Sequence, residues 1–208
     1  NLFSRGYVAY GFGDKKLKYK AELEYSFNDK KYHSREFPIH SIKASHSYDV
    51  DQIGQHYMFT NADNVFLALK RQKNDKMTYL RSSNLQYTLE TQCGFSVSAG
   101  FKYNTQEATK MMPFEDGYGN VFKKYDEALF NVTLRYAPGE KFYQTRSNRI
   151  PINLDAPVFA LTQEYAPKGF LGSMNTINKT EFSVQKRFWF SAFGYTDIIL
   201  KAGKVWSE

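Results

Sequence analysis

Polar and apolar residues alternate strictly between residues 17 and 27. Apolar or aromatic side chains take the odd positions, and Lys, Glu and Ser take the even positions. Because successive side chains of a β-strand point to opposite faces, this segment is predicted to be a strand with one apolar and one charged face. Its length matches the roughly 9–11 residues with which a tilted strand crosses a bilayer. Its apolar face ends in Tyr25 and Phe27, and aromatic residues are typical of the membrane–water boundary.

Similar segments recur along the chain. Further strands are predicted over residues 3–12, 35–49, 64–71, 77–91, 95–103, 125–137, 156–165, 178–190 and 196–205. Connections are predicted at 13–16, 28–31, 50–63, 72–76, 92–94, 105–123, 138–155 and 167–173. No segment has the 3.6-residue period of an amphipathic helix. About ten strands, several in hairpin order, predict an all-β, antiparallel up-and-down meander of the kind that forms a barrel wall.

A soluble antiparallel sheet with one face on a core gives the same alternation. A soluble, lipocalin-like barrel that binds an apolar ligand is therefore the alternative. Three features favour a transmembrane barrel instead. The strands at 17–27, 77–91 and 95–103 exceed the usual length of about 5–6 residues. Their apolar faces mix small residues with Tyr and Phe, and their other faces are polar at nearly every position. We predict one transmembrane β-barrel domain over residues 1–208, either closed within this chain or part of a larger barrel.

The alternation assigns side chains to the two faces of such a wall. The lumen-facing candidates are Lys18, Lys20, Glu22, Glu24, Lys102, Glu127 and Arg135. The lipid-facing candidates are Tyr19, Leu23, Tyr25, Phe95, Val97, Phe101, Phe130, Val132 and Leu134. Because the lumen set mixes both signs of charge, it favours salt bridges across the wall over strong ion selectivity.

Composition narrows the function classes. Aromatic residues make up 17% of the chain, which suits strands and membrane interfaces. No apolar run approaches the roughly 18 residues of a spanning helix. The lone Cys93 excludes an internal disulfide framework. The net charge of +7 comes from scattered Lys and Arg, so a nucleic-acid partner is not expected. No signal peptide is present, so an export signal has been removed or the chain is an internal piece.

The sequence gives little support for a catalytic site or a metal site. His40 and His46 share one face of a predicted strand, but six residues place them roughly 20 Å apart, too far to share a metal. His46, Ser47 and Asp49 are too close along a strand to form a triad. Nucleophile-elbow, phosphate-loop and dinucleotide motifs are absent. We expect no enzyme activity, no cofactor and no metal, although a barrel-rim hydrolase is a further hypothesis.

The Pro-containing connection at 138–155 carries Arg146, Arg149 and Asp155. These residues are candidates for a latch that holds the connection inside the lumen through a bidentate ion pair. The alternative is a solvated loop with no fixed partner. Irregular backbone within a barrel needs anchoring, which favours the latch.

Three parts of the second half carry a family resemblance. They are Tyr143 to Val158 (YQTRSNRIPINLDAPV), Pro167 to Gly172 (PKGFLG), and Lys186 to Asp197 (KRFWFSAFGYTD) with the nearby KAGKVW at 201–206. They resemble the barrel region of large Bacteroidetes outer-membrane proteins of the DUF5686 type. Such proteins carry a carboxypeptidase-like regulatory domain before a barrel similar to the Omp85/BamA-like class.

The resemblance implies a place in the bacterial outer membrane. It also implies a structural, transport (porin-like), assembly or surface-display role without catalysis. The implied partners are outer-membrane lipid and lipopolysaccharide, and other outer-membrane proteins or lipoproteins. The regulatory domain has no counterpart here, and the chain lacks the terminal aromatic residue usual in such barrels. We therefore expect a middle portion of a larger protein.

Overall fold

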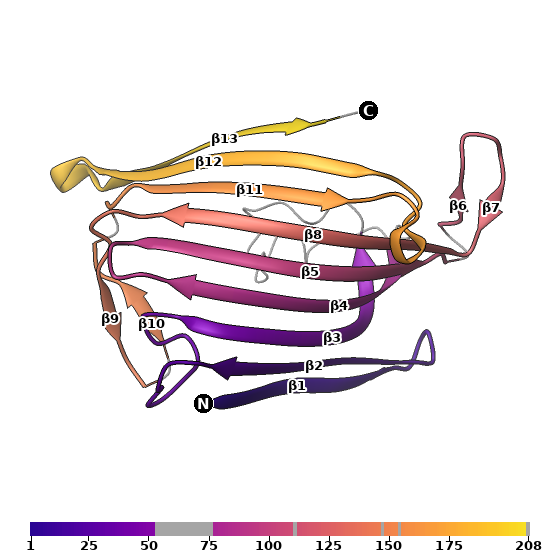
Figure 1. Ribbon diagram of the computed structural model, residues 1–208, viewed down its shortest axis with the longest axis horizontal. Coiled ribbons are helices and arrows are strands. Elements are labelled where there is room, and N and C mark those ends of the chain that lie inside the picture. Colours follow the sequence, from indigo (N-terminus) through magenta and orange to yellow (C-terminus); the bar gives the residue numbers. More distant parts are fainter. Residues whose placement is uncertain (53–76, 110–111, 147, 154, 207–208) are drawn as a thin grey trace.

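The computed structural model describes residues 1–52, 77–109, 112–146, 148–153 and 155–206. In this part of the chain, nine long strands form one antiparallel sheet in sequence order (Figure 1). They are β1 (Leu2–Gly11), β2 (Lys16–Ser26), β3 (His40–Gln52), β4 (Met77–Glu90), β5 (Phe95–Glu107), β8 (Lys124–Tyr136), β11 (Val158–Ala166), β12 (Ile177–Trp189) and β13 (Tyr195–Val205). The predicted all-β antiparallel meander is confirmed.

The connections hold small elements that the sequence did not predict. β6 (Phe114–Glu115) pairs with β7 (Val121–Phe122), and β9 (Phe142–Gln144) pairs with β10 (Arg149–Pro151). Two 3₁₀ turns, η1 (Phe170–Gly172) and η2 (Ser191–Phe193), are the helical elements of the described residues, and neither is long enough to cross a membrane. The predicted strand at 64–71 and turn at 72–76 lie outside the described residues.

The predicted start of the third strand at residue 35 is wrong, since β3 begins at His40. The carboxylate of Glu36 accepts hydrogen bonds from the backbone N–H groups of Lys31, Tyr32 and His33. A side chain that satisfies three consecutive backbone donors stabilises a compact turn in place of a strand. Pro38 also lacks the N–H that a ladder position would need. Alternation of polar residues alone could not reveal this local competition.

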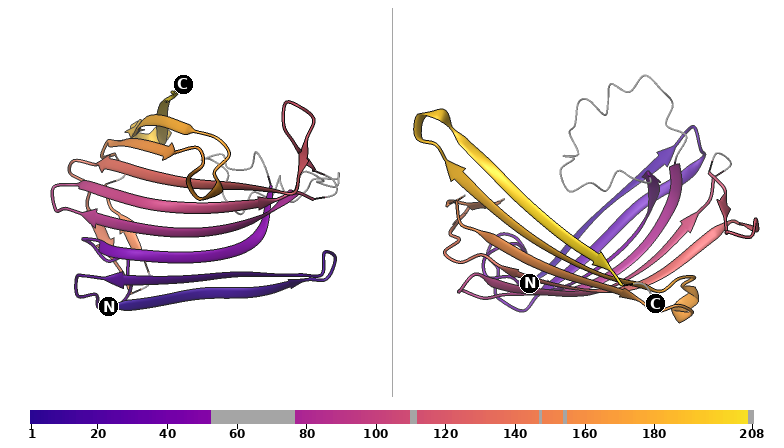
Figure 2. Two further views of the ribbon diagram at one scale, coloured as in Figure 1. Left: turned by 45° about the vertical axis from the view of Figure 1, so that its right-hand side comes forward. Right: turned by 90° about the horizontal axis from the view of Figure 1, so that it is seen from above.

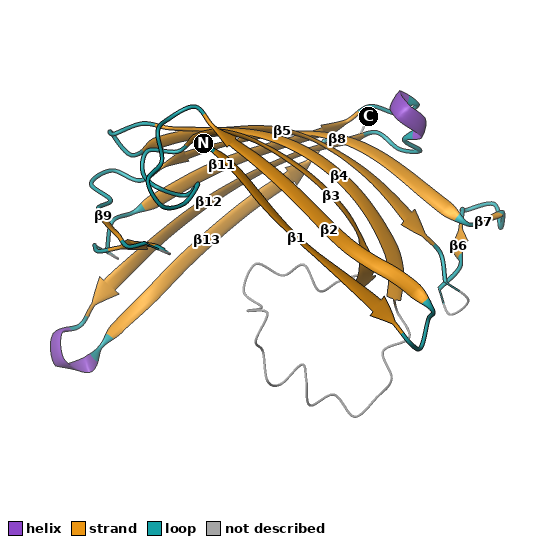
Figure 3. Ribbon diagram, turned by 90° about the horizontal axis from the view of Figure 1, so that it is seen from below, coloured by secondary structure: helices purple, strands orange, loops and turns teal. Residues whose placement is uncertain are grey.

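The sheet is strongly curved but does not close (Figures 2 and 3). β1 and β13 form its two edges. Because neighbouring strands alternate in direction, the first and ninth strands of a meander run the same way and cannot pair antiparallel. The sequence leaves open whether a barrel closes within this chain, and the sheet of the described residues is not closed. The coarser prediction, an antiparallel β-wall, holds.

The two faces of the sheet differ sharply in chemistry. On the concave face, one row of cross-strand neighbours consists of hydroxyl residues from β2 to β11. This row runs through Ser26, Ser41, Thr88, Ser98, Thr133 and Thr162. Hydroxyls bond across it at 3.1 Å between Thr88 and Ser98 and at 3.1 Å between Thr133 and Thr162. Polar side chains therefore satisfy one another on the inner side.

The convex face is apolar and open. One row of cross-strand neighbours on it runs through Leu23, Ala44, Leu85, Phe101, Phe130 and Tyr165. Leu23 is 54% exposed, while its neighbour Glu24 on the concave face is 8% exposed. Among the described residues the buried hydrophobic side chains are three alanines, whereas eight polar residues are buried. Burial is thus inverted relative to a globular domain, where Leu, Ile and Phe are inside.

The tight turn between β4 and β5 depends on Gly94. Its φ of +84° is one that L residues rarely adopt, and an added Cβ would lie 2.3 Å from the carbonyl oxygen of Ala137. We expect Gly94→Ala to lower the free energy of unfolding by about 1–3 kcal/mol or more. Gly117→Ala is the control, since its Cβ would meet nothing within 4 Å, and it should change stability by less than about 0.5 kcal/mol. Denaturant titration followed by tryptophan fluorescence measures both, and equal effects would contradict the assigned turn.

Candidate functional site: a polar cavity on the concave face

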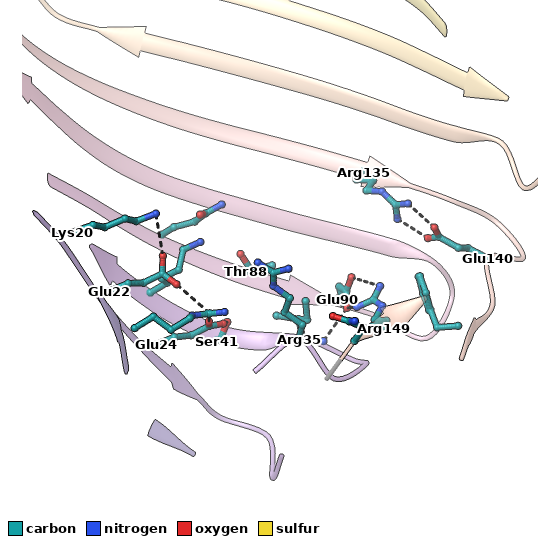
Figure 4. A pocket seen from close by; sticks show the side chains of 16 residues that line it. Lys20, Glu22, Glu24, Arg35, Ser41, Thr88, Glu90, Arg135, Glu140 and Arg149 are labelled. Carbon is teal, nitrogen blue, oxygen red and sulfur yellow. Dashed lines mark hydrogen bonds and ion pairs between the residues drawn. The ribbon is translucent and has the colours of Figure 1, made fainter. Parts of the chain in front are cut away.

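The hollow of the sheet contains a cavity of about 620 Å³ (Figure 4). Its floor is formed by β1 to β4 and β8, and its walls by the connection at 27–39 and by residues 137–146 and 148–153, which fold over the concave face. The lining residues are Arg5, Lys20, Glu22, Glu24, Arg35, Ile39, Ser41, Lys43, Gln86, Thr88, Glu90, Arg135, Glu140, Phe142, Asn148 and Arg149. The cavity is therefore almost wholly polar.

An ion-pair cluster occupies the β1–β2 side of the cavity. The guanidinium of Arg5 lies 3.1 Å from Glu22 and 3.0 Å from Glu24. Glu24 accepts a second hydrogen bond, of 2.9 Å, from the hydroxyl of Ser41. Lys20 lies 3.8 Å from Glu22. Strand alternation places these side chains on one face, and the pairing of β1 with β2 brings Arg5 opposite Glu22.

The β9–β10 hairpin is tied to the sheet by a part-buried bidentate ion pair. Arg149 donates to both carboxylate oxygens of Glu90, at 2.7 and 2.9 Å, and the two side chains are 12% and 13% exposed. Its guanidinium also lies 3.6 Å from the ring centre of Phe142. Glu90 in addition accepts a 3.0 Å hydrogen bond from the backbone N–H of Ile39. One carboxylate at the end of β4 therefore holds both inward connections.

The two inward connections also contact each other. The side-chain amide of Gln144 lies 2.9 Å from Nε2 of His33, and the rings of Phe37 and Phe142 are 5.6 Å apart. Ser34, which is buried, accepts a 3.3 Å hydrogen bond from Arg5. These contacts make the connections a fixed part of the cavity. In Figure 3, β9 lies on the inner side of the arched sheet.

Burial lowers the pKa of Lys30 in the 27–39 connection. Its ammonium group donates hydrogen bonds to the backbone carbonyls of Glu36 and Pro38. Neutral carbonyls compensate only part of the lost hydration of an ammonium, which is why desolvation dominates. Lys30 thereby helps to fold residues 30–38 into a compact segment.

The lumen-facing candidates lie on the polar face of the sheet, but only some line the cavity. Lys20, Glu22, Glu24 and Arg135 do so, and Arg135 forms a bidentate pair with Glu140 at 2.8 Å. The others lie elsewhere on the polar face. Lys18 contacts Asp14 at 3.0 Å, Glu127 accepts from Asn104 at 3.4 Å, and Lys102 is half-buried opposite Asn84.

The three latch candidates are not brought together. Arg149 makes a bidentate pair as the latch hypothesis requires, but with Glu90 rather than Asp155. Arg146 is exposed, and its guanidinium lies 5.8 Å from the ring centre of Tyr32. Asp155 is exposed in the turn before β11. The hairpin is therefore anchored to the sheet by one of the three.

The lipid-facing candidates lie on the convex face. Leu23, Tyr25, Phe130 and Val132 are exposed there. Tyr19, Phe95, Val97, Phe101 and Leu134 are half-buried. Part of this burial comes from η1, where Phe170 lies against Phe101 and Phe130 with ring centres 6.3 and 5.7 Å away.

The two histidines of β3, His40 and His46, form side-chain hydrogen bonds on the convex face of the sheet. His46 contacts Ser83 at 2.8 Å and Tyr19 at 3.1 Å, and His40 contacts Tyr87 at 3.0 Å. Both imidazole rings therefore bond to hydroxyl groups of neighbouring strands, which is a structural role.

Sequence reasoning missed several residues of the cavity, above all Glu90, Glu140, Arg5 and Lys43. A signal for two of them was present. Glu90 and Lys43 fall on the polar face by alternation, and only their partners were hidden. Glu90 and Arg149 are 59 residues apart, and no local pattern couples them.

The fold and cavity define a class: a curved, open antiparallel β-wall that is polar inside and apolar outside. Residues 1–207 match the sequence profile described as the C-terminal domain of a family of unknown function, DUF5686. The chain belongs to this family. No curated protein and no solved structure matches it.

The Glu90–Arg149 pair predicts strong coupling. Glu90→Gln or Arg149→Met should each lower the free energy of unfolding by about 1–3 kcal/mol, because each leaves a part-buried charge without its partner. The double variant should be less destabilised than the sum of the two. Denaturant titrations of all four proteins give the coupling energy. Glu164→Gln is the control, since its longer and more exposed pair with Lys179, at 3.8 Å, should contribute about 0–1 kcal/mol. Additive effects at 90 and 149 would refute the anchor.

Glu36 predicts a pH dependence of the 31–36 turn. Burial raises the pKa of Glu36, but the backbone N–H groups of His33, Lys31 and Tyr32 lower it more, so the net shift is downward. A lowered folded-state pKa stabilises the turn above the usual carboxyl pKa, and this stabilisation is lost as pH falls through the lowered value. Amide exchange at Lys31, Tyr32 and His33, corrected for intrinsic rates, should accelerate over that acidic range. Glu36→Gln should remove the transition, and an unchanged pH profile in that variant would disprove the cap.

Proposed function

We propose that this chain forms part of the wall of a transmembrane β-barrel in a bacterial outer membrane. Its role would be structural, in transport, or in assembly or surface display of other outer-membrane components, without catalysis. The observation that carries the proposal is the inverted burial: apolar side chains cover the convex face, while charged and hydroxyl side chains fill the concave one. Hydrocarbon outside and water inside satisfy both faces.

In water the convex face would be costly. Large hydrophobic residues are exposed along most strands of the sheet, including Leu23, Leu85, Phe130, Leu161 and Leu200. Contiguous apolar patches of this kind are rare on soluble monomers and mark membrane or protein contacts. The alternative, a soluble barrel around an apolar ligand, needs an apolar interior. The concave face offers charges instead.

Strand dimensions agree with a bilayer. The nine long strands of the described sheet have 9 to 14 residues, and a tilted transmembrane strand needs roughly 9–11. Aromatic residues gather near strand ends, as in the interfacial girdles of outer-membrane barrels. One end has Tyr10 and Phe12, and the β12–β13 tip has Trp189, Phe193 and Tyr195.

The apolar band also drifts along the strands. The row that begins with Leu23 in β2 becomes polar at Asn178 in β12. The second row along, toward the other end of the strands, is polar at His40 in β3 and apolar from Leu89 onward. This second row runs through Leu89, Val97, Leu134, Leu161, Phe182 and Ala202. Strands tilted across a flat hydrocarbon slab require such a shift of the apolar stretch from strand to strand.

A membrane wall has no free edge, because unpaired backbone groups are costly in hydrocarbon. The proposal therefore requires β1 and β13 to pair with strands outside this sheet, as in a larger barrel. An Omp85/BamA-like barrel, outer-membrane lipid with lipopolysaccharide, and other outer-membrane proteins or lipoproteins remain the expected architecture and partners.

Ala44 and Ser45 provide a matched test of the two faces. They are adjacent small residues of β3, with Ala44 exposed between Leu23 and Leu85 and Ser45 half-buried between Glu22 and Asn84. Ala44→Arg should destabilise folding into lipid vesicles by about 2–4 kcal/mol if it lies near the midplane, because it places a charge in hydrocarbon.

Ser45→Arg should cost about 1 kcal/mol or less, since its side chain meets water and Glu22. Urea titration of vesicle-inserted protein measures both. Equal tolerance of Arg at the two positions, or folding that is indifferent to lipid and detergent, would rule out the membrane proposal.

A further inference from the structure

The cavity on the concave face carries an excess of positive charge. Six of its lining side chains are cationic and four are acidic. Every acid contacts a cation: Glu22 and Glu24 contact Arg5, Glu90 contacts Arg149, and Glu140 contacts Arg135. Lys20 also contacts Glu22. The four acids are therefore paired with four of the six cations.

The remaining cations are Arg35 and Lys43. Within the part of the chain that the structure describes, neither has an acidic group at ion-pair distance. Lys43 lies opposite Glu24 in the register of β2 and β3. Both oxygens of that carboxylate are occupied, one by Ser41 at 2.9 Å and the other by Arg5 at 3.0 Å. The charge of Lys43 is thus left facing the cavity.

Neutral groups next to these cations suit an oxyanion. Gln86 lies opposite Lys43 on β4 and adds an amide donor. Asn148 adds a second amide from the hairpin side. Arg35 enters from the 27–39 connection and lies near Thr88, between the Glu24–Ser41 group and the Glu90–Arg149 pair (Figure 4). Lysine and arginine charges with amide donors are the usual partners of carboxylate and phosphate groups.

We propose that Arg35 and Lys43 form a binding site for the carboxylate or phosphate group of a small water-soluble ligand. The cavity volume of about 620 Å³ is in the range of small-molecule sites, roughly 300–1,000 Å³. Arg35 binds the oxyanion through its planar fork, and Lys43 adds a point charge from the floor. The ion pairs around them fix the cavity shape. The site goes beyond the barrel role and does not depend on membrane insertion.

Calorimetric titration of the intact protein in detergent at low salt tests the site. The probes are inorganic phosphate and succinate, which separate the two oxyanion classes. Arg35→Gln and Lys43→Gln should each weaken binding of the preferred probe by about 10-fold or more, since hydrogen bonds to charged groups contribute about 1.5–3 kcal/mol. Lys43→Arg, which keeps the charge, should retain binding.

Lys179→Gln is the matched control. Lys179 is another cation of the polar face, but it contacts Glu164 and Glu181 and lies outside the cavity. This variant should bind as the unmodified protein does. Binding of neither probe at millimolar concentration would overturn the proposal, as would equal binding by the Arg35→Gln, Lys43→Gln and Lys179→Gln variants. Since the measurement needs no bilayer, failure here leaves the membrane test at Ala44 and Ser45 unaffected.

Discussion

A single carboxylate, Glu90, organises the inner side of this sheet. A buried charge is tolerated only when it is paired and hydrogen-bonded, and Glu90 meets this need with two segments that are remote in sequence. Arg149 arrives from the β9–β10 hairpin and the backbone N–H of Ile39 from the 27–39 connection. Both segments must fold over the concave face to reach it. The cavity exists because its walls are held to the end of β4.

The inner side has no apolar core to stabilise it. The described hydrophobic residues that are buried are alanines, so burial of apolar surface contributes little between the walls and the floor. Order comes from backbone ladders, hydroxyl rows and ion pairs. In the proposed membrane setting the apolar contribution moves to the convex face, where lipid takes the place of a protein core. This separation of roles explains why the polar side chains of the concave face form specific hydrogen bonds and ion pairs, while the convex face carries a mixture of Leu, Phe, Val and Tyr.

Strand alternation made most of the wall predictable. Residues 77–90 and 95–107 form strands because their apolar and polar positions have a period of two, and the structure places them close to the predicted bounds. Prediction failed where non-local or side-chain-to-backbone contacts decide. The cap of Glu36 on residues 31–33 shortened the third strand. The partner of Arg149 could not be read from sequence either, because it depends on how far the hairpin folds inward.

The same inward folding explains why two cations are left over. On the β11–β13 side the polar face balances its charges between adjacent strands, as Lys179 and Lys201 both contact Glu181. On the β2–β4 side, the shortest ion pairs of the acids come from residues beyond these strands. Arg149 takes Glu90, and Arg5 from the edge strand takes Glu22 and Glu24. Lys43 of the floor and Arg35 of the near wall then line the cavity with no carboxylate of the described residues at ion-pair distance. The contacts that build the cavity therefore also set its charge, so weakening the Glu90–Arg149 pair would change both.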